Sequence, residues 1–146
     1  MNTSVFNERI IGKKQLIFII EDNEGEIFGY YLNTEIVDYY DRQETDSKSF
    51  EFNLQSKNNQ LSKPMKFEIK NLKYGGIILC DESDKVLICL GDIHLMKENS
   101  EKESYCEQNE YKIYYHGIKN TICGKTSNSN EWIYFKLKRI LVIQMK

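Results

Sequence analysis

The apolar residues of this chain occur in short segments that alternate with polar residues at a period of two, and turn-forming residues separate the segments. The segment SFEFNLQ places Phe50, Phe52 and Leu54 on one face of an extended chain, and MKFEIK repeats the alternation with its apolar residues inward. No segment keeps a helical period over three turns. The pattern predicts a mainly β protein, namely a two-sheet antiparallel β-sandwich with short flanking helices at most.

Three hairpins can be located from their turn residues, among about eight strands in all. The first joins residues 16–20 to residues 27–32 through EDNEGE, where Asp, Asn and Gly favour a tight turn. Gly29 predicts a close backbone approach or a bulge in the second of these strands. The second hairpin joins SFEFNLQ to MKFEIK, and the third joins GGIILC to VLICL. The final segment, WIYFKLKRILVIQM, ends in an apolar run and is predicted to be a central strand.

Composition restricts the class of protein further. The chain has 146 residues and is expected to form a single domain over residues 1–146. Its net charge of −2 leaves no basic face for several phosphates, so we expect no nucleic-acid partner. The longest apolar runs are far shorter than the ~20 residues that cross a bilayer, so we expect no membrane insertion. Four cysteines without an export signal predict reduced thiols and a cytoplasmic location.

The segment VLICLGDIHLMKEN brings a thiol, a carboxylate and an imidazole within six residues. If the segment is one regular strand, Cys89 lies on the face opposite to Asp92 and His94. A nucleophile must lie within about 3 Å of its base. Parity along a regular strand therefore predicts that this segment is not a catalytic site, and only a bulge at Gly91 would reverse that expectation.

Other motifs for chemistry are incomplete. The cysteines and histidines form no CxxC or HxxxH unit, so neither a metal nor another cofactor is expected. Gly124-Lys125-Thr126 lacks the upstream glycine of a phosphate-binding loop, since Lys119 stands at that position. No GxSxG nucleophile motif occurs. The sequence thus predicts no catalytic residues and no enzymatic activity.

Two groups of residues are the candidates for function. Ring-bearing side chains crowd the segment NEYKIYYHG and predict an interaction surface, with packing against the sandwich as the alternative. These residues are Tyr111, Tyr114, Tyr115 and His116. Cys106 and Cys123 lie near polar loops and are the candidate exposed thiols for oxidation by peroxide, with ordinary unreactive cysteines as the alternative.

Taken in order, several segments resemble those of the TLDc domain (TBC/LysM-associated domain) family. LIFIIEDNEGEIFGYYL resembles the first hairpin of that family, with Phe28-Gly29-Tyr30-Tyr31 in place of its FGGY element. SFEFNLQ and PMKFEI resemble the next two strands, and FKLKRILVIQM resembles the closing strand. The family's GDL strand and its Ser-x-Cys element correspond to Gly91-Asp92-Ile93 and Ser104-Tyr105-Cys106. The resemblance extends from about Val5 to Met145, and the family's N-terminal helical part is shortened or missing.

The resemblance implies a β-sandwich without agreed catalytic residues. It also implies a protein-interaction module that acts in the oxidative-stress response, or in regulation of the vacuolar proton-pumping ATPase through one of its subunits. The alternative function is a redox sensor that uses a peroxide-sensitive thiol. The sequence does not specify the oligomeric state.

Overall fold

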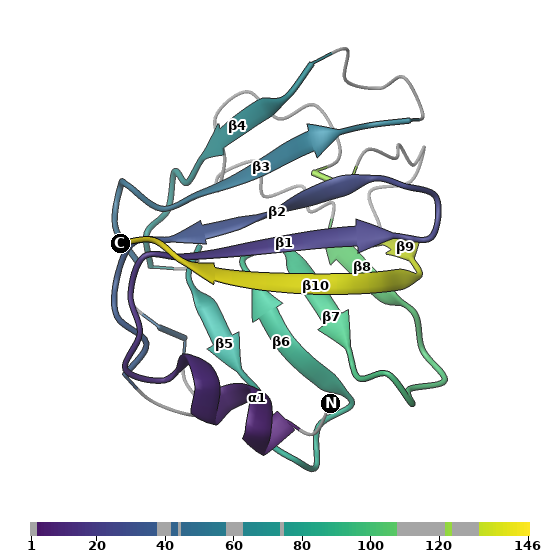
Figure 1. The fold of residues 1–146 in the computed structure, drawn as a ribbon, viewed down its shortest axis with the longest axis horizontal. Helices are drawn as coiled ribbons and strands as arrows, with labels where there is room; N and C mark the ends of the chain where they lie inside the picture. The colour runs from purple at the N-terminus through teal and green to yellow at the C-terminus, as the bar shows by residue number, and fades with distance from the viewer. Residues whose placement is uncertain are drawn as a thin grey trace.

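The fold is a sandwich of two antiparallel sheets, as the sequence predicts (Figure 1). The computed structural model describes residues 3–37, 42–43, 45–57, 63–73, 75–107, 122–123 and 132–146. This part of the chain forms ten strands, against the eight or so expected, and one short helix, α1 (Thr3–Ile10). Within it, no helix is long and apolar enough to cross a membrane.

Each sheet has five strands. Sheet A is ordered β10 (Leu137–Gln144), β1 (Leu16–Asp22), β2 (Ile27–Leu32), β3 (Phe50–Gln55) and β4 (Met65–Glu68). Sheet B is ordered β5 (Ile77–Leu79), β6 (Val86–Leu90), β7 (Ile93–Met96), β8 (Ser104–Glu107) and β9 (Trp132–Phe135). The strands of the two sheets cross steeply, and α1 lies at one end, beside β5 and β6 (Figure 1). Asn7 ties α1 to sheet B through a hydrogen bond from its Nδ2 to the Cys80 carbonyl at 2.9 Å.

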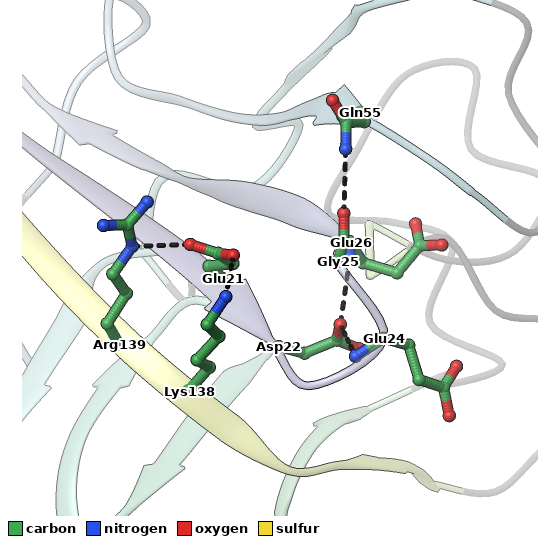
Figure 2. A network of polar contacts seen from close by, with 8 residues as sticks. All are labelled: Glu21, Asp22, Glu24, Gly25, Glu26, Gln55, Lys138 and Arg139. Carbon is green, nitrogen blue, oxygen red and sulfur yellow. Dashed lines mark hydrogen bonds and ion pairs between the residues drawn. The ribbon is translucent and has the colours of Figure 1, made fainter.

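The three predicted hairpins are confirmed as β1–β2, β3–β4 and β5–β6. In the β1–β2 turn, Asp22 Oδ1 accepts hydrogen bonds from the backbone N–H groups of Glu24 and Glu26, and Gly25 has a φ of +84° (Figure 2). This Asp–Gly chemistry is what the segment EDNEGE predicts. At Gly29 the backbones of β1 and β2 approach closely, as predicted, because a Cβ there would lie 1.9 Å from the Phe18 carbonyl oxygen.

The closing segment departs from the prediction of one central strand. It divides at Lys136 into β9, which joins sheet B, and β10, which is an edge strand of sheet A. The fully apolar run indicated burial on both faces, but Leu141 and Ile143 are 46% and 45% exposed. The predicted surface loop after Lys97 also contains a strand, β8, whose Ser104 and Cys106 point inward.

The core lies between the inner faces of the two sheets. Phe28 of β2 and Phe135 of β9 meet edge to face across it, with ring centroids 5.1 Å apart. Both side chains are buried, as are Phe18 and Tyr30 from sheet A and Ile88 from sheet B. The Tyr30 hydroxyl donates a hydrogen bond to the Gly75 carbonyl at 2.5 Å, so the polar end of this buried side chain has a partner.

Candidate functional site

The segment VLICLGDIHLMKEN is a hairpin, and this overturns the parity argument. β6 ends at Leu90 and β7 begins at Ile93, so Gly91 and Asp92 form a two-residue turn in which Gly91 has a φ of +58°. The turn reverses the chain and places Cys89 directly across from His94. Facing residues on neighbouring antiparallel strands point to the same side of the sheet. Cys89 and His94 therefore share the outer face of sheet B.

Side-chain contacts connect this pair to an acidic group. The Cys89 Sγ lies 3.2 Å from His94 Nδ1, and His94 Nε2 lies 3.3 Å from Glu107 Oε1. The hydrogen bond with His94 lowers the pKa of Glu107, so this carboxylate is ionised at neutral pH. The Tyr105 ring stacks on the imidazole, with centroids 4.5 Å apart and planes 9° from parallel. The imidazole is thus held in orientation by its ring neighbour and by Glu107.

A second thiol completes the group on sheet B. Cys80 directly follows β5 and lies beside Cys89, because Cys89 pairs with Ile78, two residues before Cys80, and the two thiols interact. Both residues are 7% exposed. The pKa of Cys80 is lowered by the hydrogen bond from Cys89, while the same bond and burial raise the pKa of Cys89. We refer to Cys80, Cys89, His94 and Glu107 as the thiol site. Among the described residues, no three His, Cys, Asp or Glu side chains are arranged to hold a metal ion.

The predicted redox thiols lie elsewhere and are not exposed. Cys106 and Cys123 are 3% and 0% exposed, and their thiols are hydrogen-bonded to each other in the core. Burial raises the pKa of Cys106 well above its usual value. Their exposure was inferred from polar neighbours in sequence, but Cys106 faces inward from β8. The predicted interaction surface lies outside the described residues, and it comprises Tyr111, Tyr114, Tyr115 and His116.

The turn residue Asp92 gives the thiol site a pH-dependent neighbour. Burial raises the pKa of Asp92 to about 7, and the nearby Glu107 charge adds to the effect. The unfolded chain releases this proton near the ordinary value of about 4, so this group lowers stability as pH rises from about 4 to 7. We expect Asp92→Asn to raise the free energy of unfolding by about 1 kcal/mol at about pH 8 and by nothing below about pH 4. Urea unfolding of both proteins at the two pH values checks this, and an equal gain at both would contradict it.

The outer face of sheet A is unusually apolar. β3 alternates as predicted, but its apolar side is the outer one: Phe50 is half-buried, whereas Glu51 and Asn53 are fully buried. Glu51 Oε1 accepts a hydrogen bond from the Asp92 N–H at 3.2 Å, and Asn53 Nδ2 donates one to the Ile122 carbonyl at 2.7 Å. One carboxylate oxygen of Glu51 and the amide nitrogen of Asn53 thus have partners inside, and the phenylalanines of β3 face outward.

Aligned rows of apolar side chains extend this face to the edge of the sheet. Leu141 lies across from Ile19, and Ile143 lies across from Ile17. The Tyr31 ring packs against Phe50 with centroids 5.2 Å apart. We define the sheet A outer face as the outward-facing side chains of Ile17, Ile19, Tyr31, Phe50, Phe52, Leu141 and Ile143. Leu141 and Ile143 are its exposed members, whereas Phe52 is 7% exposed. Exposed apolar side chains that adjoin one another are typical of interaction sites.

β10 borders this face as an edge strand. It pairs with β1, and Glu21 of β1 binds both Lys138 Nζ, at 2.7 Å, and Arg139 Nε (Figure 2). A groove of about 680 Å³ runs beside β10, between residues 135–140 and residues 96–104. Charged residues of both signs line it, among them Glu101, Lys102 and Lys136. The edge is therefore bordered by open space in the described part of the chain.

The fold and these surfaces define a class: a two-sheet β-sandwich with apolar side chains on the outer face of one sheet and a group of thiol, imidazole and carboxylate side chains on the other. The family model of the TLDc domain matches residues 1–138, so the chain belongs to the TLDc domain family. A comparison with curated proteins found no match. The resemblance found in the sequence is thereby confirmed.

Proposed function

We propose that this chain is a non-enzymatic protein-interaction module of the cytoplasm, which acts in the oxidative-stress response. Its proposed partner is a subunit of the vacuolar proton-pumping ATPase, as the family suggests. The observation that carries the proposal is the sheet A outer face. On this face β3 places Phe50 and Phe52, although the same strand buries the Glu51 carboxylate and the Asn53 amide.

The orientation of β3 supports binding because it departs from the usual burial of apolar side chains. If the burial preference of side chains alone set its orientation, β3 would turn Phe50 and Phe52 inward and Glu51 outward. Sequences depart from such local rules mainly at functional sites. Within the described part of the chain β10 is an edge strand, and an edge strand is where a partner can bind by strand addition. Apolar side chains beside an open strand edge form a surface suited to a protein partner.

The absence of enzymatic activity is supported by the shape of the thiol site. Cys89 is 7% exposed, so little of its thiol can meet a substrate. The groove beside β10 and another of about 700 Å³ beside Trp132 are both lined by residues other than Cys89 and His94. Enzymes usually place their nucleophile in a concave pocket that encloses the substrate. The thiol site therefore suits small reagents better than an extended substrate.

Binding of the purified chain to the peripheral sector of the vacuolar ATPase, by biolayer interferometry, tests the proposal. We expect the double variant Leu141→Lys with Ile143→Lys to weaken binding at least tenfold, roughly 1.4 kcal/mol or more, because it places charges on the sheet A outer face. Trp132→Lys with Tyr134→Lys is the matched control. Those residues are 53% and 49% exposed on the outer face of sheet B.

Three outcomes would contradict the proposal. The wild-type chain would show no binding to the peripheral sector, the sheet A variant would bind as tightly as the wild type, or the sheet B control would lose as much affinity as the sheet A variant. Unfolding curves of both variants exclude loss of the fold as the cause of weaker binding.

A further inference from the structure

We propose that the thiol site is a peroxide-driven, reversible disulfide switch, in which Cys80 is oxidised, Cys89 forms the disulfide with it, and His94 acts as the base. The site lies on the outer face of sheet B, away from the sheet A outer face, so this inference does not depend on the proposed partner. This pair differs from Cys106 and Cys123, the candidate thiols named from the sequence, which are buried in the core.

The base is held in the form that the step needs. Glu107 is ionised and accepts a hydrogen bond from His94 Nε2, so in the neutral ring the proton resides on that nitrogen. Nδ1 is then the acceptor, and it lies 3.2 Å from the Cys89 Sγ. Stacking on Tyr105 fixes the plane of the ring. Once Cys80 is oxidised and no longer accepts it, the Cys89 proton therefore has an oriented acceptor within hydrogen-bond distance.

The two thiols have different roles because their surroundings differ. Cys80 is the first to lose its proton, since the Cys89 S–H stabilises the Cys80 thiolate and lowers its pKa. The Lys97 charge acts in the same direction, while Asp81 and Asp84 oppose it. Cys89 retains its proton, which burial and its neighbour Cys80 both favour. A thiolate is the form that attacks peroxide.

The chemistry proceeds in two balanced steps. The Cys80 thiolate attacks one oxygen of hydrogen peroxide, the O–O bond breaks, and uptake of one proton releases water and leaves a sulfenic acid. Cys89 then passes its proton to His94 Nδ1 and attacks the Cys80 sulfur. The S–O bond breaks, an S–S bond forms, and the leaving hydroxide takes the proton from His94 as water. Two equivalents of an external thiol reduce the disulfide and restore both cysteines.

Access and position favour this pair over the other. Cys80 and Cys89 lie on the outer face of sheet B and are each 7% exposed, so only a small oxidant can reach them. Cys106 and Cys123 also touch, but they lie in the core, and Cys123 is 0% exposed. Reactivity of a thiol follows its thiolate character and its exposure. We therefore expect one dithiol of the chain to respond to peroxide and the other to stay reduced.

The sequence allows a direct test, because trypsin separates all four cysteines. Cys80 lies in residues 74–85, Cys89 in residues 86–97, Cys106 in residues 103–112 and Cys123 in residues 120–125. The folded full chain is treated with hydrogen peroxide, alkylated under denaturing conditions, digested and analysed by mass spectrometry. We expect the first two peptides to appear as a disulfide-linked pair, which dithiothreitol separates. The other two peptides serve as internal controls and should be fully alkylated.

Variants separate the proposed roles. Cys89→Ser should stop the reaction at a Cys80 sulfenic acid, which dimedone traps, and Cys80→Ser should abolish the linked pair. His94→Gln should slow disulfide formation about 100-fold at neutral pH, without slowing formation of the sulfenic acid, because general-base catalysis typically contributes that much. Linkage of Cys106 to Cys123 in its place, no linked pair in the wild type, or equally fast linkage in urea-unfolded chain would overturn the proposal. An unchanged linkage rate in His94→Gln would overturn the role of His94.

Discussion

Replacing Phe28 by alanine is expected to lower the free energy of unfolding by about 3–5 kcal/mol, the usual cost of removing a phenylalanine from a core. Phe28 is fully buried, and its ring meets Phe135 at 88° between the ring planes. One residue belongs to β2 and the other to β9, so this contact joins sheet A to sheet B. The loss is a large share of the 5–15 kcal/mol or so that stabilises a typical domain.

Urea unfolding followed by the fluorescence of Trp132, the single tryptophan, measures this change. Phe50→Ala is the matched control, because Phe50 is only half-buried on the sheet A outer face. The control should lose about 1 kcal/mol. Equal losses for the two variants would contradict the assignment of Phe28 to the core and of Phe50 to the outer face.

We expect Gly29→Ala to lower the free energy of unfolding by about 3 kcal/mol, also a large loss. The added Cβ would lie 1.9 Å from the Phe18 carbonyl oxygen and 2.8 Å from the Phe52 ring. The ring belongs to a side chain, whereas the carbonyl belongs to the backbone of β1 and has less freedom to move. The strands must therefore shift apart, and the cost is not confined to one side chain.

The double variant Gly29→Ala with Phe52→Leu distinguishes these two clashes. Shortening Phe52 removes the contact with the ring and leaves the contact with the backbone. Relative to Phe52→Leu alone, Gly29→Ala should still cost most of its original free energy, which urea unfolding of the four proteins in the cycle measures. Full recovery in the double variant would show that the ring, and not the β1 backbone, excludes a side chain at this position.

The hairpins of the fold could be predicted because their signals are local. Asp22 and Gly25 supply the turn between β1 and β2, and period-two alternation supplies the strands on either side. The same reasoning erred at Gly91-Asp92, although a Gly-Asp pair between apolar residues is itself a signal for a two-residue hairpin. Treating the segment as one strand put Cys89 and His94 on opposite faces. A single turn changed the conclusion for the whole thiol site.

Other features depend on contacts that no local pattern contains. The alternation of β3 does not tell which side faces the core, because that depends on partners far along the chain. Glu51 bonds to a group 41 residues away and Asn53 to one 69 residues away. The apolar run of β10 indicated a central strand for the same reason, since apolar residues on an outer face have the same sequence pattern as buried ones.

The two surfaces separate the two proposed activities. The sheet A outer face has no cysteine among its defining residues, and it is suited to contact with a protein. The thiol site is small and nearly enclosed, and it is suited to a reaction with peroxide. Variants on one surface should thus leave the activity of the other unchanged, so each proposal can be tested without the other.

The proposed contact with the protein partner involves the sheet A outer face and its edge strand β10. Amide hydrogen exchange of the chain, alone and with the peripheral sector of the vacuolar ATPase, measures this contact directly. We expect slower exchange for peptides that cover residues 137–144 and 16–22, and unchanged exchange in residues 86–96. Slower exchange confined to residues 86–96, or no change anywhere in the chain, would contradict it.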